Sequence, residues 1–220
     1  VDNSPVISDM EFDFLMHELE ALEREWPEFY SPDSPTQKVG SDIEDNNKGG
    51  FVQRAHRYPM LSLSNTYSKE EIIEFASRAD KILEGRKFSY CCELKFDGTA
   101  ICLSYSHGLL VRALTRGDGQ KGDDVTTNAR MISNIPQHLK GDYPEDLEIR
   151  GEILMPYQAF DKLNEERIRQ EETPFANPRN AASGSLKLLD PQEVKKRELY
   201  CTLYHMPAQS MAASLAASHS

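Results

Sequence analysis

Residues 93–98 read Glu93-Leu94-Lys95-Phe96-Asp97-Gly98, and the prediction of the fold starts from this stretch. Apolar and polar residues alternate over Phe88–Phe96, which predicts a β-strand. In a strand, residues i and i+2 share a face and lie roughly 6.6 Å apart. Leu94 and Phe96 therefore belong to an apolar face, and Lys95 lies on the other face between two carboxylates.

The position of Lys95 between two acids has two explanations. It is a nucleophile whose ammonium group is held in place and deprotonated when a phosphoryl group arrives, or it forms a same-face salt bridge on an exposed sheet. Gly98 allows a close backbone approach or a turn. At average residue usage, K-x-D-G occurs by chance in about 5% of chains of this size, so the motif needs support from the rest of the sequence.

Two further segments combine charged residues with a strand. Thr115–Gly122 (TRGDGQKG) places three glycines beside Arg116, a combination that holds a phosphate or forms a flexible hairpin loop. Leu147–Leu154 is a predicted strand with three charged residues on one face: Glu148, Arg150 and Glu152. Such a face suits a ribose hydroxyl, or else it is a surface ladder of ion pairs.

Residues 175–187 (FANPRNAASGSLK) are rich in small residues with isolated polar ones, and predict a long loop. Such a loop suits close packing against a nucleotide. A tight tertiary turn is the alternative explanation of the same composition.

Two helices are predicted before the motif. Ser8 and Glu11 form a capping box, and apolar residues continue at helical spacing to Trp26, where Pro27 ends the helix. The second helix begins at Ser68, and its apolar face is Ile72, Phe75, Ala76, Ala79 and Leu83.

After the motif, a hairpin is predicted over residues 101–115, and a helix can start at Pro156. Strands occur in runs with helices between the groups, so the predicted fold class is α+β. A turn-rich polar stretch suggests a domain boundary near Gly50.

Composition narrows the classes of function. The 220-residue chain is 39% hydrophobic and 28% charged, as is typical of a soluble protein of one or two domains. No apolar run approaches the roughly 20 residues of a membrane helix. The four cysteines form no CxxC pair, so they predict buried free thiols in a reducing cytoplasm. The net charge of −11 argues against nucleic-acid binding unless a local basic patch or another part of the protein supplies it.

Together the segments resemble the bacterial NAD-dependent DNA ligases. The matching stretches follow the order of that family over nearly all of residues 4–191: SDMEFD, DSPTQKVG, HRYPMLSLSNTY, CCELKFDG, TRGDGQKGDDVTTN, LEIRGEIL and FANPRNAASGSLKLLD. The resemblance implies a covalent nucleotidyltransferase (adenylation) fold with antiparallel sheets over residues 51–220, C-terminally incomplete. It implies that residues 1–50 are part of a small helical domain that recognises nicotinamide mononucleotide.

The resemblance also assigns roles to single residues. Lys95 attacks the α-phosphate of NAD to form lysyl-AMP, and Asp97 orients or deprotonates it. The other matched positions bind the cofactor: Ser62, Leu63 and Glu93 at adenine, Arg116 at AMP, Arg179 on the AMP and DNA side, Glu152 at ribose, and Asp9 and Asp13 at nicotinamide. AMP then passes to the 5′-phosphate of a DNA nick, which is sealed.

The implied enzyme is a cytoplasmic monomer of DNA replication and repair. Its cofactors are NAD and Mg²⁺, its partner in the full-length protein is nicked double-stranded DNA, and neither a membrane partner nor a metal site built from its own side chains is expected.

The sequence departs from the family at several places. Phe12 stands where the family has Tyr, and Asp123 and Lys187 replace the more usual Glu and Arg. The Tyr-His pair of the nicotinamide site, the D-G-x-V-x-K segment and the DNA-contacting modules do not appear, so the resemblance implies a part of a longer protein. Two alternatives stay open: a catalytically silent chain that only binds NAD or adenine-site ligands, and a triphosphate-dependent nucleotidyltransferase.

Overall fold

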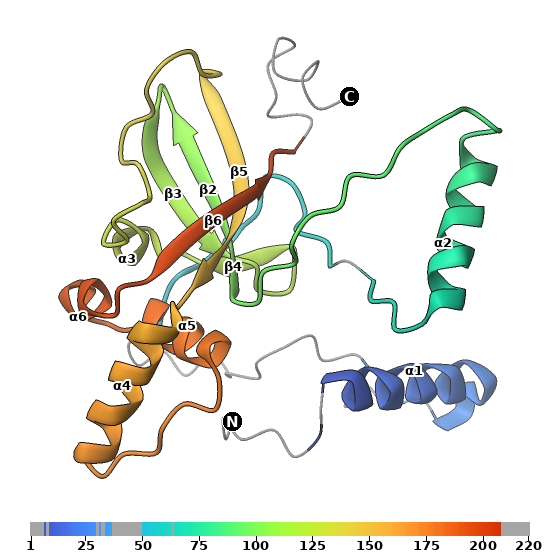
Figure 1. Cartoon of the computed structure of the whole chain (residues 1–220), viewed down its shortest axis with the longest axis horizontal. Coiled ribbons are helices and arrows are strands. Elements are labelled where there is room, and N and C mark those ends of the chain that lie inside the picture. Colours follow the sequence, from blue (N-terminus) through green and yellow to red (C-terminus); the bar gives the residue numbers. More distant parts are fainter. Residues whose placement is uncertain are drawn as a thin grey trace.

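The computed structural model describes residues 7, 9–29, 31, 34–36, 50–62 and 64–207. At its centre is a four-stranded antiparallel sheet of order β3-β2-β5-β6 (Figure 1). Its strands are β2 (Thr99–Ser106), β3 (Leu109–Thr115), β5 (Asp146–Leu154) and β6 (Tyr200–His205). A smaller antiparallel pair joins β1 (Gln53–Ala55) to β4 (Lys121–Asp123). Antiparallel sheets with helices between the strands confirm the predicted α+β class.

The central strands follow the predicted hairpin. The turn between β2 and β3 has positive φ at His107 (48°) and Gly108 (77°), which suits the twist of a two-residue hairpin. β5 pairs with the other edge of β2 in continuous register, from Thr99↔Ile153 to Ser106↔Asp146. This register places alternate residues of β2 and β5 on the same face.

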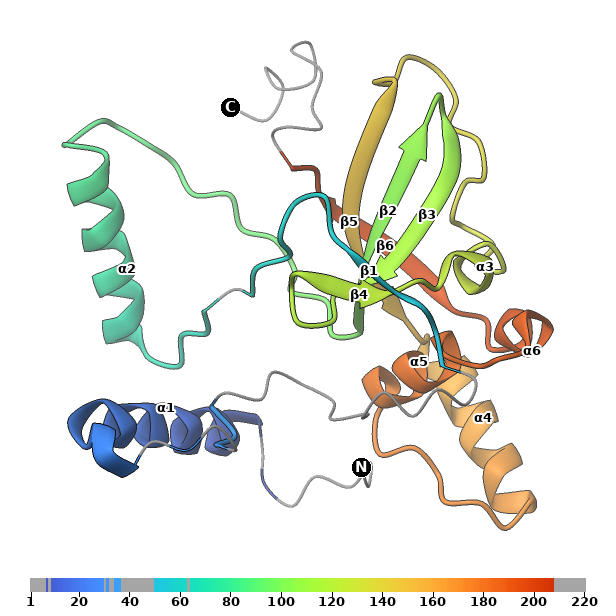
Figure 2. The ribbon, with the colours of Figure 1, turned by 180° about the vertical axis from the view of Figure 1, so that it is seen from behind.

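The hydrophobic core lies on one face of the sheet. Ile101, Leu103 and Ile153 are fully buried there, in one cluster with Ala181 and Leu186. Four helices lie on this side and at one end of the sheet (Figures 1 and 2). They are α3 (Thr126–Ala129), α4 (Tyr157–Arg169), α5 (Pro178–Leu186) and α6 (Pro191–Lys196). The opposite face carries the charged residues of β5, Glu148, Arg150 and Glu152, which alternate with the residues facing the core.

The loop predicted over residues 175–187 is wrong, because most of it forms α5. Asn177 caps the helix by accepting from the amide of Asn180 at 2.8 Å, and Pro178 occupies the first turn. Asn before Pro is a helix-start signal. Ala181 and Ala182 are fully buried, so the small residues allow the helix to approach the sheet closely.

The strand predicted over Phe88–Phe96 is also wrong. Residues 86–97 form neither helix nor strand, and all are exposed. Phe88 and Tyr90 stack edge to face at 5.2 Å, and Tyr90 lies 6.3 Å from Phe75. Alternation reports two faces but not the presence of a partner strand, and here the aromatic residues of one face meet a helix instead.

The two helices predicted before the motif are confirmed. α1 (Asp9–Glu25) precedes a short 3-10 turn, η1 (Pro27–Phe29), and α2 (Lys69–Ile82) begins after Ser68. The Ser68 hydroxyl accepts from the amide of Glu71 at 3.1 Å, as the predicted capping box requires. Both helices stand apart from the sheet in the two views (Figures 1 and 2).

Some predictions about these segments fall outside the structure. Ser8 and residues 37–49 lie outside the described residues, so the first capping box and the boundary near Gly50 stay predictions. Of the four thiols, Cys102 and Cys201 are buried as predicted, whereas Cys91 and Cys92 are exposed. Within the described ranges, no helix combines the length and apolarity needed to cross a membrane.

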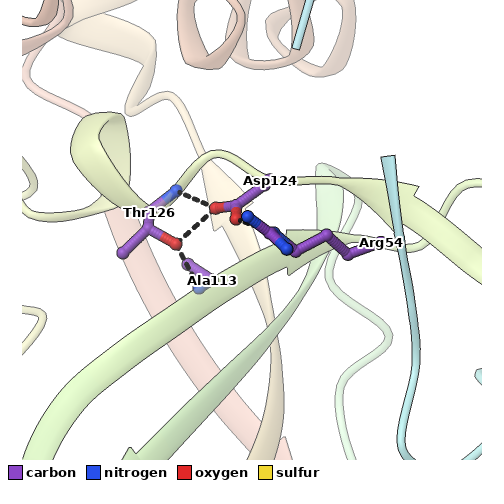
Figure 3. A network of polar contacts seen from close by, with 4 residues as sticks. All are labelled: Arg54, Ala113, Asp124 and Thr126. Carbon is purple, nitrogen blue, oxygen red and sulfur yellow. Dashed lines mark hydrogen bonds and ion pairs between the residues drawn. The ribbon is translucent and has the colours of Figure 1, made fainter. Parts of the chain in front are cut away.

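A polar network connects the end of β4 to β1, β3 and α3 (Figure 3). Asp124 accepts from the Arg54 guanidinium at 2.7 Å and from the hydroxyl and amide of Thr126 at 2.5 and 3.2 Å. The same hydroxyl accepts from the amide of Ala113 at 2.9 Å. The network therefore links β1, β3 and α3 through Asp124, the residue that follows β4.

Candidate active site

The motif residues lead directly into β2. Lys95 and Asp97 lie at the exposed end of the extended segment 86–97, and Asp97 Oδ1 pairs with Arg179 Nη1 at 2.9 Å. Gly98 is buried, and a Cβ there would lie 2.2 Å from the carbonyl oxygen of Ile153. Only glycine lets the chain pass so close to β5, which fixes where the lysine enters the site.

Glu152 of β5 lies close to the motif, because it is paired with Ala100, two residues after Gly98. Burial raises the pKa of its carboxyl, while a bond from the Gly98 amide and the nearby charges of Arg179 and Lys95 act in the opposite direction. The predicted nucleophile, ribose carboxylate and AMP-site arginine are therefore within electrostatic reach of one another. On a half-buried strand, such an acid needs polar partners to stay ionised.

Ser62 and Arg116 form a second group. Arg116 Nη1 donates to Ser62 Oγ at 3.2 Å, and the Arg116 carbonyl lies 3.0 Å from His56 Nε2. The segment before Ser62 runs along the turn after β3 through bonds from the Met60 amide to the Gly119 carbonyl (2.9 Å) and from the His56 amide to the Gln120 carbonyl (2.8 Å). The two predicted residues thus sit on one paired unit.

The same turn does not form a phosphate cradle. Its amides already donate inside the protein: those of Gln120 and Lys121 to the Asp118 carboxylate at 2.8 and 2.7 Å, those of Asp118 and Gly119 to backbone carbonyls. A Cβ at Gly117 would lie 1.9 Å from the Lys121 carbonyl. The glycines serve a tight turn, and the Arg116 guanidinium remains the candidate anion-binding group of this segment.

Tyr204 lies beside Glu152 and was not predicted. Its hydroxyl lies 3.5 Å from Glu152 Oε2. Burial and the Glu152 charge raise the pKa of Tyr204, whereas Arg150 and Arg116 act to lower it. The signal available in the sequence was the alternation in Tyr200–His205, in which Cys201 faces the core.

Not all predicted residues gather at this cluster. Leu63 lies outside the described residues. Glu93 is exposed, with its carboxylate 4.0 Å from Cys91 Sγ. Lys187 pairs with Asp123 at 2.7 Å, so the two departures from the family pattern contact each other.

The N-terminal acids lie on α1. The side chain of Asp9 is not described. The carboxylate of Asp13 has partners within the protein, because its Oδ2 accepts from Asn65 Nδ2 at 2.8 Å and from the Tyr67 hydroxyl. The bonds from Tyr67 and then Asn65 lower the pKa of Asp13. α1 is therefore anchored to the chain just before α2.

The cluster can act on a nucleotide. It offers an amine, two guanidinium groups and a carboxylate, the groups that phosphoryl attack, anion binding and hydroxyl binding need. Within the described ranges, no three His, Cys, Asp or Glu side chains are placed to hold a metal.

Comparison with known proteins agrees with this chemistry. A model of the NAD-dependent DNA ligase adenylation domain matches residues 48–220, and one of the DNA ligase-like, N-terminal NAD+-binding domain matches residues 1–40. The chain is 56% identical to a DNA ligase of Bacteroides fragilis over 93% of its own length. It is 50% identical to a DNA ligase of Flavobacterium johnsoniae over 96% and 54% identical to one of Azobacteroides pseudotrichonymphae over 94%. It spans 30 or 31% of the length of these three relatives.

Proposed function

This chain belongs to the NAD-dependent DNA ligase family, and from that premise we propose that Lys95 is the residue that takes AMP from NAD. The observation that carries the proposal is the position of the motif: Gly98 lies against Ile153, next to Glu152 on β5, and Asp97 pairs with Arg179 at 2.9 Å. A nucleophilic lysine must be held near the phosphate it attacks, and a strand start fixed by Gly98 supplies that position.

The proposed step is a nucleotidyl transfer. Lys95 Nζ, as a neutral amine, forms a bond to the α-phosphorus of NAD, and the bond from that phosphorus to the bridging oxygen breaks. Nicotinamide mononucleotide leaves with the oxygen, and the amine loses a proton to give a phosphoramidate. Asp97, two residues from the nucleophile, receives or directs this proton.

The other residues bind the nucleotide. Glu152 accepts hydrogen bonds from the ribose hydroxyls, and Arg116 and Arg179 neutralise the phosphate. Ser62, Leu63 and Glu93 remain the proposed lining of the adenine site. In the structure Arg179 is paired with Asp97, so a bound phosphate would take over a guanidinium that is already in place.

Mg²⁺ is proposed as the second cofactor. Mg²⁺ is commonly held by one or two carboxylates together with substrate phosphates. Asp97, which is paired with Arg179 in the structure, is the carboxylate that would meet such an ion beside the phosphate, and the ion would neutralise phosphate charge there.

The nicotinamide half of NAD is proposed to meet α1. Asp9 and Asp13 are one turn apart on the same helix face, and acids suit a cationic ring. Because Asp13 Oδ2 is held by Asn65 and Tyr67, we propose that its other oxygen faces the ligand.

The whole ligase reaction belongs to a longer protein. We propose that a full-length ligase carrying this chain passes AMP to the 5′-phosphate of nicked double-stranded DNA and seals the nick. It would act as a cytoplasmic monomer in DNA replication and repair.

The choice of nucleotide tests the proposal. A full-length ligase carrying this chain, freed of AMP, is incubated with Mg²⁺ and either NAD or ATP, and its intact mass is measured. We expect the mass of one AMP to be added with NAD only. Addition from ATP would favour a triphosphate-dependent nucleotidyltransferase, and no addition from either would favour a silent binding domain.

A further inference from the structure

A buried ion pair lies on the same face of β5 as Glu152. Glu148 and Arg150 precede Glu152 at every second position, and their side chains are only 5% and 13% exposed. Glu148 Oε1 lies 3.6 Å from Arg150 Nη2. Across the sheet, Arg150 is opposite Cys102 and Glu148 is opposite Ser104.

The pair is poorly suited to a purely stabilising role. Neither Glu148 Oε1 nor Arg150 Nε has a hydrogen-bond partner in the part of the chain that is described. A cavity of about 180 Å³ lies beside Glu148. Burying two charges costs solvation, and pairs with incomplete hydrogen bonding seldom recover that cost. The pair therefore calls for another explanation.

A hydrogen bond from Arg150 to the segment before Ser62 supplies that explanation. Arg150 Nη2 donates to the carbonyl oxygen of Tyr58 at 3.0 Å. Tyr58 is in the middle of segment 56–62, which ends at Ser62 and is paired with the turn that carries Arg116. Arg150 is thus a side-chain bridge from β5 to the unit that holds Ser62 and Arg116.

We propose that the Glu148–Arg150 pair is a positioning device that sets the distance between the Ser62–Arg116 group and Glu152, and so shapes the nucleotide site. Glu148 fixes the guanidinium, and the guanidinium holds the Tyr58 carbonyl. Its bearing on NAD rests on the function proposed above.

A matched exposed pair provides the control. Arg57 lies beside Tyr58 and pairs with Asp146 of β5 at 3.5 Å, so it joins the same two segments. Its side chain is 61% exposed and that of Asp146 53%. Exposed pairs contribute little, so Arg57→Met should change nothing that depends on positioning.

The test compares Arg150→Met, the double variant Glu148→Gln/Arg150→Met, and Arg57→Met, all in a full-length ligase carrying this chain. Arg150→Met alone leaves a buried unpaired charge and should lower the melting temperature clearly. The double variant removes both charges and should melt within about 4 °C of the parent.

Two readouts report positioning in the double variant. Hydrogen exchange at the amides of His56 and Met60 should accelerate at least about tenfold, the size expected when a hydrogen bond from a charged donor is lost. The NAD concentration for half-maximal AMP addition should rise by about the same factor, while addition at saturating NAD stays within about twofold.

Three results would overturn the inference. Unchanged exchange and unchanged half-saturation in the double variant would show that the pair positions nothing. The same changes in Arg57→Met would show that any contact between these segments suffices. A melting temperature as low in the double variant as in Arg150→Met would make the pair a stabilising element. If the parent itself takes no AMP, the proposed function fails, and exchange and melting still decide whether the pair holds the segment.

Discussion

At the scale of single residues, Glu152 carries a cost in folding stability that its proposed role at the ribose would explain. Its pKa is raised, chiefly by burial, so the ionised carboxylate opposes folding at neutral pH. The pKa of such a carboxyl is higher in the folded protein than in the unfolded chain. Its protonated form therefore stabilises the fold below the unfolded pKa, and this stabilisation is lost as the pH rises through the folded pKa.

Glu152→Gln should therefore leave the melting temperature at pH 7 unchanged or slightly higher. The same variant should lower AMP addition from NAD at least about tenfold, because the charged hydrogen bond to ribose is lost. Glu165→Gln, on the exposed side of α4, is the matched control. A marked loss of stability with normal AMP addition in Glu152→Gln would assign Glu152 to the framework.

Residue identities were more predictable than residue partners. The requirement for Gly98 followed from the motif, and the structure places the carbonyl of Ile153 against it. The Asp97–Arg179 and Asp123–Lys187 pairs join positions far apart in the sequence, and no local pattern reports such contacts. Tyr204 was missed because its role depends on which strand lies beside β5.

At the scale of elements, the Asp124 network should make stability depend on pH. Burial raises the pKa of Asp124, but bonds from Thr126 and Arg54 outweigh it, so the pKa lies below the usual 3.8. A lowered folded pKa means that the stabilisation is present at neutral pH and is lost as the pH falls through the folded value.

Asp124→Asn is accordingly expected to cost about 1–2 kcal/mol at pH 7. The difference between the urea midpoints of parent and variant should shrink as the pH falls from 6 towards 3. Asp161→Asn, on the exposed face of α4, should show no such trend. A difference that is constant with pH would mean that the Asp124 charge is not involved.

A second element, α1, is open to a test by substrate. Asp9→Asn/Asp13→Asn in a full-length ligase carrying this chain should weaken the use of NAD about tenfold or more, while sealing of a pre-adenylated nick stays almost unchanged. The nicotinamide half takes part only in the first reaction. If the rates of both reactions decrease together, the acids serve to anchor α1 through Asn65 and Tyr67. If neither rate decreases, α1 does not bind the nicotinamide.

Elements with their own start and stop signals were predictable. α1, α2 and the hairpin of β2 and β3 follow from periodicity, capping and turn residues. The segment 86–97 failed because its alternation needed a partner strand, and α5 failed because buried alanines resemble a loop composition until a sheet is placed beneath them. The first error is tertiary and is not visible within a window of local sequence, whereas the start of α5 had a local signal, Asn177 before Pro178.

At the scale of the whole molecule, charge limits what this chain can bind. The net charge is −11, and two cations of segment 175–187, Arg179 and Lys187, are each paired with an acid. Binding to DNA draws on neutralising its phosphates, so the isolated chain should hold nicked duplex only weakly at about 150 mM salt. Fluorescence anisotropy measures this directly, and sub-micromolar affinity would show that a local basic patch has been overlooked.

The most direct test of the central claim is to locate AMP on the protein. A full-length ligase carrying this chain is incubated with NAD and Mg²⁺, digested, and analysed by mass spectrometry for the peptide that bears AMP. Lys87→Ala, on the same exposed segment, serves as the control, beside Lys95→Ala and Lys95→Arg, since arginine supplies no neutral nitrogen near pH 7. The account predicts one AMP on Lys95, retained in Lys87→Ala and absent from both Lys95 variants; AMP on another residue, or AMP addition that survives Lys95→Ala, would contradict it.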